Sequence, residues 1–484
     1  MQNRSRFTQS IFILLVLIGA CPAFAAGPKN VIVMIGDGMG FNHIAAGDLY
    51  DKGTTGTQSF EQFPVRLAMS TFPYGASYDP AKCWSDFSYA SKAKYTDSAP
   101  AATAMSTGKK SYDGAIGFVG EKAATAERGK HASEYAKEVG RATGVITTVE
   151  ISHATPAGFS AHNKNRDNYS QIAEEMLSES KLDLIMGCGH PAFDDDGKPV
   201  KISQKGSEFV GGVAMWDKLL NQSLSTADCD GDGKADPWTV IQTRKEFQDL
   251  GTATTVPKRL CGVAQVHTTL QAARSGNKNV AESAPDATEK NRRGGLSEDK
   301  NADAFVMPLT ESVPTLAEMS QGALNFLSHT PKGQENGFFI MIEGGAIDWA
   351  AHGNLQGRLI EEDMDFFRAV DTVVAWVNAN GGWENNLVII TADHETGYLT
   401  GPNSGVDGAP VWNSLVNNGK GKMPGMEFHE KHHTNNLVAF FANGPAETLE
   451  KLDACATGQD PVRGKYLDNT DIAKTIIPIF TSKN

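Results

Sequence analysis

The chain has 484 residues and a formal net charge of -13 at pH 7, with 40% hydrophobic and 21% charged residues. This composition is typical of a soluble globular enzyme, and the length suits one large α/β domain with an insertion, or two domains. The net negative charge argues against a nucleic-acid partner, because a protein that binds nucleic acid needs clustered Lys and Arg to neutralise the phosphates.

The N-terminus has the pattern of a secretory signal peptide. Arg4 and Arg6 precede an apolar stretch at 11–20, and positions 23–25 have the A-x-A form of a cleavage site. We expect residues 1–26 to be removed, with cleavage after residue 25 or 26. Losing the two arginines takes the formal charge from -13 to -15. The mature protein would then be periplasmic or secreted.

An anchored lipoprotein through Cys21 is the alternative, but the first core strand follows so soon that the tether would be short. No later apolar run is long enough to span a membrane. Export to an oxidising compartment would permit two disulfides with one thiol left over, and the spacing does not fix the pairing. The cysteines of the mature chain are Cys83, Cys188, Cys229, Cys261 and Cys455.

The first core strand and the segment after it offer an acid and a hydroxyl. Residues 31–36 form an apolar, β-branched run that leads to Asp37. Residues 95–108 predict a helix of small residues that opens on Ser98. The first N–H groups of a helix lack partners and its dipole is positive there, so a phosphate or an oxyanion is stabilised beside this serine. Thr-Asp-Ser is also an ordinary N-cap string, so the segment alone does not establish a nucleophile.

Four later apolar runs border further side chains that bind metals. The runs lie at 144–152, 338–342, 387–392 and 437–441, and each reads as a short, buried parallel strand. Ligands bind outside the carboxyl ends of the strands in open α/β sheets, so we expect these side chains to converge. They are His153, Thr155, Glu343, Asp348, His352, Asp393, His394 and His433.

The spacing of these residues indicates which metals they suit. Asp348 and His352 are four apart in a stretch able to begin a helix, so they share one face and can hold one ion. His153 and Thr155 are two apart, on one side of an extended segment. Mixed imidazole and carboxylate ligands favour zinc, whereas oxygen-rich ligands with Thr and Glu favour magnesium.

Helical patterns alternate with the strands and predict a doubly wound α/β fold, with helices on both faces of a mostly parallel central sheet. Residues 194–305 are rich in Gly, Asp, Lys and Asn and have few periodic patterns, so we interpret them as a long insertion over the sheet edge. The helices are expected at 167–180, 313–328, 359–378 and 471–480, with a further strand at 182–186.

The expected insertion contains an acidic loop with the spacing of an EF-hand-type calcium site. Acids at relative positions 1, 3, 5 and 9 and a glycine at position 6 match that pattern, but position 12 is Thr239 and the closing acid is absent. A structural calcium ion and a solvated acidic turn both remain open. A calcium-dependent surface module without chemistry would be a third class of function, and the metal ligands and nucleophile argue against it. The loop residues are Asp228, Asp230, Asp232, Lys234 and Asp236.

A competing motif lies at His429-Glu430-Lys431-His432-His433, which fits the H-E-x-x-H pattern of zinc metalloproteases with the glutamate as general base. That pattern works only on a helix. The Gly-rich segment 419–425 before it and the strand-like run after it leave room for little more than a loop. We therefore expect His429 and His432 to be loop residues or neighbours of a metal ligand.

Taken together, these motifs resemble the alkaline phosphatase family, from about Asn30 to the C-terminus. The resemblance implies one catalytic domain over residues 27–484 and a metal-dependent phosphomonoesterase with a broad substrate range. Small phosphate monoesters are the expected partners, and a homodimer is the assembly we consider. The matching segments are Asp37-Gly38-Met39-Gly40, Thr96-Asp97-Ser98-Ala99, His153-Ala154-Thr155-Pro156-Ala157, Arg166, Glu343-Gly344-Gly345, Asp348 with His352, Thr391-Ala392-Asp393-His394, and His433-Thr434.

The resemblance also implies roles for single residues. Ser98 would be the nucleophile that forms a phosphoserine, and Arg166 would hold the phosphoryl oxygens. The implied cofactors are two zinc ions and one magnesium ion. One zinc would lie on Asp348, His352 and His433, the second on Asp37, Asp393 and His394, and magnesium on Asp37, Thr155 and Glu343 with His153 in or near its shell.

Charge gives an independent check on this set. The adjacent side chains of Asp393 and His394 must diverge, which would suit two neighbouring ions. Four negative charges would meet in one pocket, from Asp37, Glu343, Asp348 and Asp393. Burying them together is too costly unless cations compensate. The implied ions would make the pocket positive, which suits a phosphate dianion.

Two positions depart from the best-known bacterial pattern of the family. His153 stands where some members have an acid, so the third metal site loses a charge and should bind magnesium more weakly. Trp349 stands where others have a basic residue near the phosphate, and it either packs at the mouth or contacts substrate. Related sulfatases need a modified cysteine or serine, and diesterases commonly use threonine. Ser98 with Arg166 therefore favours monoesters, with a phosphodiesterase of the same superfamily as the alternative.

Overall fold

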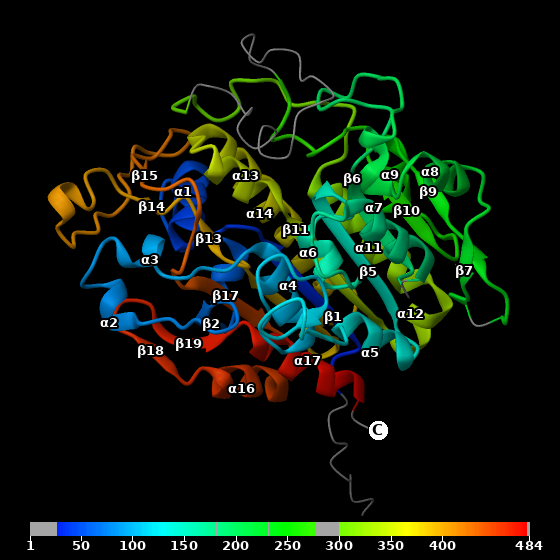
Figure 1. Ribbon diagram of the computed structural model, residues 1–484, viewed down its shortest axis with the longest axis horizontal. Coiled ribbons are helices and arrows are strands. Elements are labelled where there is room, and N and C mark those ends of the chain that lie inside the picture. Colours follow the sequence, from blue (N-terminus) through cyan, green and yellow to red (C-terminus); the bar gives the residue numbers. More distant parts are fainter. Residues whose placement is uncertain (1–26, 180–181, 231, 276–299, 482–484) are drawn as a thin grey trace, which may run out of the picture.

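The computed structural model describes residues 27–179, 182–230, 232–275 and 300–481, and a large sheet runs through it (Figure 1). The expected signal peptide lies outside the described residues. The 11-stranded sheet has, in spatial order, β18 (Gly458–Asp460), β19 (Gly464–Asp468), β2 (Val65–Ser70), β17 (Val438–Asn443), β12 (Asn386–Thr391), β1 (Asn30–Gly36), β11 (Phe338–Gly344), β5 (Ala142–Glu150), β6 (Leu184–Cys188), β10 (Leu260–Val263) and β9 (Thr239–Ile241).

Strands β12 to β9 in this order all run parallel, which confirms the predicted direction of β12, β1, β11, β5 and β6. Strands β10 and β9 were not predicted. Strand β1 is buried at every residue between β11 and β12, because its side chains meet a helix layer on each face. Strand β17 is antiparallel to both β12 and β2, so the prediction of a parallel strand at 437–441 is wrong. A short apolar run looks the same in either direction. The reversal places the start of β17, next to His433, at the edge where the parallel strands end.

Helices on both faces of the sheet confirm the doubly wound arrangement. In one layer, α14 packs on β1 and β11 and contacts α1 and α11. In the other, α4 contacts α6, α5 and α17. The two layers comprise α1 (Phe41–Lys52), α9 (Arg244–Leu250), α11 (Leu316–His329) and α14 (Gln356–Ala379), and α4 (Ser98–Thr107), α5 (Ala132–Glu138), α6 (Ala154–Gly158) and α17 (Thr470–Thr481).

Three of the four expected helices are confirmed by α11, α14 and α17. The fourth, expected at 167–180, is shorter than predicted: α7 (Tyr169–Glu174) continues as a π-helical turn, Glu175–Glu179. The remaining short elements are α2 (Pro80–Cys83), α3 (Tyr89–Lys92), α8 (Val213–Leu220), α12 (Pro331–Asn336), α13 (Ala346–His352), α15 (Gly382–Asn385), α16 (Ala446–Cys455), β3 (Phe118–Val119), β4 (Glu127–Arg128), β7 (Ser225–Ala227), β8 (Asp236–Pro237), β13 (Glu395–Thr396), β14 (Leu399–Thr400), β15 (Glu427–Phe428) and β16 (His433–Thr434).

Residues 194–305 are predicted to lie over the sheet edge, but strands from this segment form part of that edge instead. Strands β10 and β9 extend the sheet beyond β6, in the green region of Figure 1. The side chains of Trp216 and Trp238 from this segment are fully buried. Residues 194–275 are therefore integrated with the domain core. Whether the segment is an insertion relative to other proteins stays a prediction.

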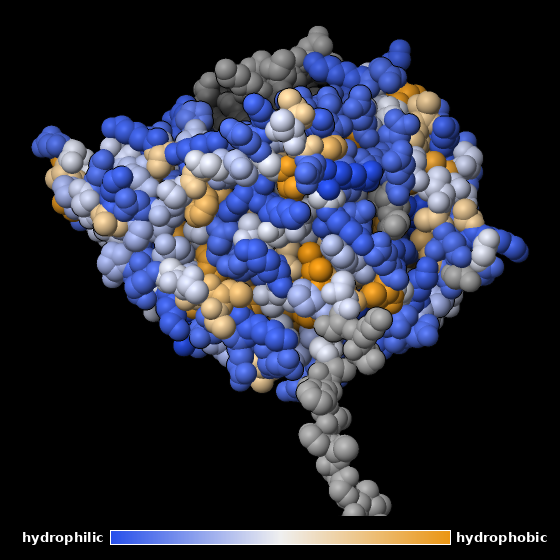
Figure 2. Space-filling view, turned by 60° about the horizontal axis from the view of Figure 1, so that its bottom comes forward, coloured by the Kyte–Doolittle hydropathy of each residue, from blue (hydrophilic) through white to orange (hydrophobic). Residues whose placement is uncertain are grey.

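The five cysteines among the described residues are all free thiols, so the two disulfides that export would permit are not formed between them. Four of the thiols are buried and the fifth is partly buried. Among the helices that the structure describes, none combines the length and apolar character needed to cross a membrane. Hydrophobic residues on the face shown in Figure 2 are scattered in small groups among polar ones.

Candidate active site and metal centre

The side chains predicted to bind metals gather where the parallel strands end. Asp37 directly follows β1, Glu343 is the last residue but one of β11, and Asp393 follows β12 by one residue. The helix α13 begins just after β11 and carries Asp348 and His352, which confirms the helix predicted from their spacing. The sheet thus brings residues more than three hundred positions apart in the chain to one edge.

The first set of ligands comprises Asp348, His352 and His433, whose donor atoms lie close enough to share one ion. The Nε2 atoms of the two histidines are 3.1 Å apart, and they lie 3.3 and 3.4 Å from the carboxylate oxygens of Asp348. His352 donates its other ring proton to the carbonyl of Lys431 (2.5 Å), and His433 donates to that of Thr96 (2.8 Å). In the neutral form of each ring, these hydrogen bonds place the proton on Nδ1, so that Nε2 can bind a metal and faces the carboxylate.

The second set comprises Asp37, Asp393 and His394, which are all fully buried. His394 Nε2 lies 3.5 Å from Asp37 Oδ1, 3.2 Å from Asp393 Oδ2 and 3.1 Å from Ser98 Oγ. The expectation that Asp393 and His394 diverge is wrong. The chain turns at once into β13, and Asp393 Oδ1 accepts hydrogen bonds from the backbone N–H groups of Gly38 and His394, both at 3.0 Å. These bonds fold the carboxylate back over its neighbour.

The third set comprises Thr155, Glu343 and Asp37, with His153 beside it. The expectation that His153 and Thr155 share an extended segment is also wrong, because His153 is the N-cap of the short helix α6. Pro156 in the first turn has a backbone angle suited to that position, which favours the helix. Glu343 accepts a hydrogen bond from Thr147 at 2.5 Å. His153 Nε2 lies 3.3 Å from a guanidinium nitrogen of Arg166.

Burial and mutual repulsion act on these acids in the absence of ions. Burial, followed by the charges of Asp393 and Asp348, holds the pKa of Asp37 well above its usual range. Burial raises the pKa of Glu343 to about 7 and that of Asp393 to about 6. Burial also opposes ionisation of Asp348, but its two histidine neighbours outweigh that effect and hold its pKa well below the usual range. The site cannot keep all four acids ionised near neutral pH without cations.

Unsatisfied oxygens identify where such cations would fit. At this edge of the sheet, four of the described side chains each have one buried oxygen without a hydrogen bond: Asp37 Oδ1, Thr155 Oγ1, Glu343 Oε1 and Asp393 Oδ2. Buried polar atoms without a partner are rare in native proteins and call for an explanation such as an ion. Carboxylate and hydroxyl oxygens with adjacent imidazoles are a donor set suited to divalent metals.

Ser98 is the first residue of α4, as predicted, and is 3% exposed. Arg166 donates to Asp97, whose carboxylate also accepts the backbone N–H groups of Ala99 and Gly114, each at 3.2 Å. Sequence reasoning treated Asp97 only as part of an N-cap string. The structure gives Asp97 a second contact, which fixes the guanidinium of Arg166 near the start of α4.

Trp349 does not lie at an open mouth. Its side chain is 2% exposed and its ring packs edge-on against that of His153, with centroids 5.7 Å apart. Of the two readings from the sequence, the packing role has this contact in its favour. The contact also links Trp349 to the third set of ligands.

The segment 429–433 forms no helix. It runs from the end of β15 through a turn into β16, so the arrangement that the metalloprotease pattern requires is absent from this described segment. His429 Nε2 lies 2.7 Å from the hydroxyl of Thr400, and His432 is exposed. Of the three histidines of the motif, only His433 lies among the side chains predicted to bind metals.

The acidic loop brings Asp228, Asp230 and Asp236 together, with donor atoms within 4.8 Å of one another. A cation of the chain itself lies among these acids. Lys258 Nζ is 2.6 Å from Asp230, 2.9 Å from Asp232 and 3.1 Å from Asp236.

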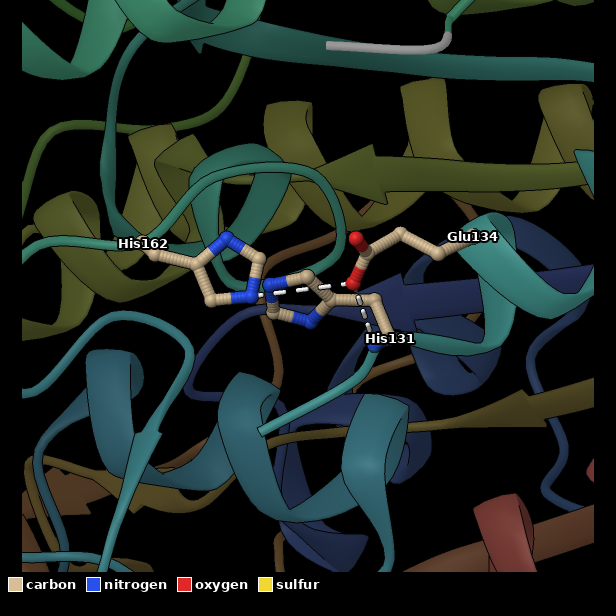
Figure 3. A group of neighbouring side chains, drawn as sticks. All are labelled: His131, Glu134 and His162. Atoms are coloured by element: carbon tan, nitrogen blue, oxygen red, sulfur yellow. Dashed lines mark hydrogen bonds and ion pairs between the residues drawn. The ribbon is translucent and has the colours of Figure 1, made fainter. Parts of the chain in front are cut away.

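A further cluster away from the catalytic edge consists of His131, Glu134 and His162 (Figure 3). The donor atoms lie within 4.8 Å of one another, which is compatible with a metal ion. However, a nitrogen of each ring already has a carbonyl oxygen 2.8 Å away, from Ala161 and Gly129 respectively. A metal on those nitrogens would displace the carbonyls, so we interpret the cluster as a hydrogen-bonded support of α5.

Comparison with known proteins agrees with this geometry. A family profile described as alkaline phosphatase matches residues 28–476. Alkaline phosphatase 4 of Bacillus subtilis is 28% identical over 94% of this chain and 79% of its own length. Alkaline phosphatase of Escherichia coli is 28% identical over 86% of this chain and 81% of its own length.

A solved structure agrees as well. The alkaline phosphatase from the Antarctic bacterium TAB5 aligns with a TM-score of 0.59 at 25% identity, and the match covers 95% of this chain and 100% of that one. The profile covers nearly the whole chain, and Ser98 and the side chains predicted to bind metals meet at one edge of the sheet. The chain belongs to the alkaline phosphatase family and is a metal-dependent phosphomonoesterase.

Proposed function

We propose that the enzyme hydrolyses a broad range of phosphate monoesters through a phosphoserine on Ser98, with two zinc ions and one magnesium ion bound. One zinc would be held by Asp348, His352 and His433, the second by Asp37, Asp393 and His394, and magnesium by Asp37, Thr155 and Glu343. The observation that carries the proposal is the contact of Ser98 Oγ with His394 Nε2 at 3.1 Å, beside buried oxygens that lack hydrogen bonds.

The zinc ions would supply a lowered pKa for the serine hydroxyl and a positive charge for the departing oxygen. Ser98 Oγ forms a bond to phosphorus while the bond from phosphorus to the ester oxygen breaks, and the alcohol leaves. Arg166, held by Asp97, directs its remaining donors at the phosphoryl oxygens. Water then breaks the bond from Ser98 Oγ to phosphorus and releases inorganic phosphate.

Two measurements test this proposal. Metal analysis of the purified enzyme should give two zinc ions and one magnesium ion per chain, with a much higher rate on a phosphate monoester than on its methyl diester. Acid quenching during turnover of a labelled monoester should trap phosphate on Ser98, and Ser98→Ala should lose the label while keeping its zinc. Label on another residue, or full activity of the variant, would overturn the assignment of the nucleophile.

The third metal position has a particular feature, because His153 adds no negative charge to it. A TAB5 alkaline phosphatase in which a histidine is changed to aspartate has been described with magnesium in its M3 site, at 25% identity to this chain. We propose that His153 weakens magnesium binding in this chain. His153→Asp should bind magnesium more tightly in an equilibrium titration, and an unchanged affinity would contradict this role.

We further propose that residues 1–26 direct export and are then removed, which would place the mature enzyme in the periplasm or outside the cell. N-terminal sequencing of the exported protein should begin at residue 26 or 27, whereas a lipid attached to Cys21 would establish the anchored alternative.

For the assembly we propose a homodimer. Light scattering of the purified protein in solution would test this by measuring its mass. A structural calcium ion in the loop at 228–236 is proposed as well, and Lys258 would have to yield to it.

A further inference from the structure

Thr396 lies between the two sets of ligands proposed for zinc. It is the second residue of β13 and is fully buried. Its Cα is paired with that of His433 in β16, and its backbone N–H donates to the carbonyl of Gly38 at 3.0 Å. The backbone of Thr396 is therefore fixed on one side by the strand that carries a ligand of the first set, and on the other by the turn that follows Asp37.

The side-chain hydroxyl of Thr396 contacts one ligand from each set. Its Oγ1 atom lies 2.6 Å from Asp348 Oδ1 and 3.2 Å from His394 Nδ1. An ionised carboxylate can only accept, so the hydroxyl donates its proton to Asp348. The oxygen of the hydroxyl then accepts the Nδ1 proton of His394. This arrangement leaves His394 Nε2, the atom that faces Ser98, without a proton.

We propose, on the basis of the function argued above, that Thr396 is a positioning residue that couples the two zinc positions. Through one hydroxyl it orients the carboxylate of Asp348 and selects the tautomer of His394 that can bind a metal. An ion at either position fixes the hydroxyl in the orientation that the other position needs. Partners of this kind around metal ligands typically change metal affinity about 10- to 100-fold when they are removed.

The turn at Gly38 is built to admit this contact. A Cβ atom at Gly38 would lie 2.8 Å from Thr396 Oγ1 and 2.9 Å from Asp348 Cα, closer than packed atoms come. The φ angle of Gly38 is +72°, a conformation that other residues rarely adopt. The absence of a side chain at Gly38 therefore leaves the space in which threonine and carboxylate meet.

The test compares three variants of the full-length protein. Thr396→Val keeps the shape and removes the hydroxyl, while Thr396→Ser keeps the hydroxyl. Thr391→Val is the matched control, because Thr391 is equally buried and its hydroxyl donates to the backbone carbonyl of Ala439 at 2.8 Å. Zinc affinity is measured at both positions by competition with a coloured chelator, starting from the metal-free protein.

Thr396→Val should weaken zinc binding about 10- to 100-fold and abolish any cooperativity between the two positions. Thr396→Ser should bind nearly as tightly as the wild type. Thr391→Val should lower the melting temperature about as much as Thr396→Val does but leave zinc affinity unchanged. Equal zinc affinities for Thr396→Val and the wild type would overturn the role of Thr396. A wild type that binds no zinc would instead contradict the proposed function.

Discussion

Two acidic groups in this protein are built from the same kind of residue but are neutralised in different ways. At the catalytic edge, Asp37, Glu343 and Asp393 each keep a buried oxygen without a hydrogen bond. In the loop at 228–236, the ammonium group of Lys258 lies within 3.1 Å of three carboxylates. The acids of the loop therefore have a cation from the chain itself, whereas those of the edge require one from solution.

Backbone groups reinforce this difference. Within the loop, Asp228 accepts the N–H of Gly233 at 2.9 Å, and Asp232 accepts that of Lys234 at 2.8 Å. Residues 232–235 of the loop are also exposed, so water screens the charge of Asp232. Acid content alone therefore does not identify a metal site. Burial together with unsatisfied oxygens separates the two groups.

Removal of divalent ions should produce the largest effect, and it should act through the catalytic edge alone. Each ion present at a thousand times its dissociation constant stabilises the folded state by about 4 kcal/mol, and the bare acids would also repel one another. A chelator that strips all divalent ions should abolish phosphatase activity and lower the melting temperature by many degrees. Calorimetry and a monoester assay measure the two effects.

Adding different metal ions back to the stripped protein distinguishes the two acidic groups. Zinc with magnesium should return both activity and melting temperature, and calcium alone should return neither. If calcium alone restored the melting temperature, the loop would be the main metal-dependent element and the comparison would fail. If the stripped protein kept its full melting temperature, the burial of uncompensated acids would need another explanation.

Loss of Arg166 should have the next largest effect, and only on catalysis. A monoester presents two anionic oxygens to the guanidinium, whereas a diester presents one and adds bulk. Arg166→Ser should cost about 1.5 to 3 kcal/mol on a monoester, roughly 10- to 100-fold in kcat/KM, because the proposed zinc ions would still hold the phosphoryl group. The rate on the methyl diester should fall much less.

The control for this prediction is Arg128→Ser, which removes an arginine whose side chain is 59% exposed and which is not part of the site. It should leave both rates unchanged. Equal losses on monoester and diester in Arg166→Ser would remove this residue as the element of selectivity. The phosphodiesterase reading would then have to be considered again.

The positions of Ser98 and of the strand-end ligands could be predicted from the sequence, because apolar runs and the residues after them are local patterns. The direction of β17 could not, since an apolar run has no polarity. Strand β9 has only three residues, Thr239–Ile241, and pairs with a strand about twenty positions away, so it has no periodic signature. Short edge strands are defined by their neighbours and not by their own residues.

The residues that support the ligands were missed for a related reason. Asp97 contacts Arg166 and Thr396 contacts Asp348, each far away in sequence, and no local spacing marks either contact. Lys258 lies 22 positions beyond the last acid of the loop, outside any loop motif. Long-range pairing of this kind becomes visible only after the chain has folded.

One acidic residue outside both groups extends the comparison, because it is buried without a neighbouring cation. Asp363 in α14 is fully buried, and neither of its carboxylate oxygens has a hydrogen bond. Burial, followed by the charges of Glu362 and Asp48, holds the pKa of Asp363 well above its usual range. Burial also raises the pKa of Glu362 to about 8. We expect Asp363 to be neutral in the folded protein.

The pH dependence of stability tests this expectation. An unfolded aspartate loses its proton near pH 4, while the folded one keeps it. The raised pKa therefore favours folding below the unfolded value, and that contribution is lost as the pH rises toward the folded value, by about 1.4 kcal/mol per pH unit. In urea unfolding of the metal-loaded protein, Asp363→Asn should lose less stability between pH 5 and pH 8 than the wild type. Asp371→Asn, an exposed acid of α14, should follow the wild type.

Calcium binding to the loop should give the smallest effect, and Lys258 should limit it. The ammonium group lies among the acids that would hold calcium, and hydrogen bonds to Asp230, Asp232 and Asp236 raise its pKa. Calcium must displace this group in the wild type but not in Lys258→Met. The variant should therefore gain more stability, about 2.7 kcal/mol at a hundred times the dissociation constant. Phosphatase rates should not change in either protein.

A variant with asparagine in place of Asp228, Asp230 and Asp232 should show no response to calcium. Equal responses of wild type and Lys258→Met would show that the lysine does not compete, and no response in any of them would leave the loop as a solvated turn closed by its own lysine.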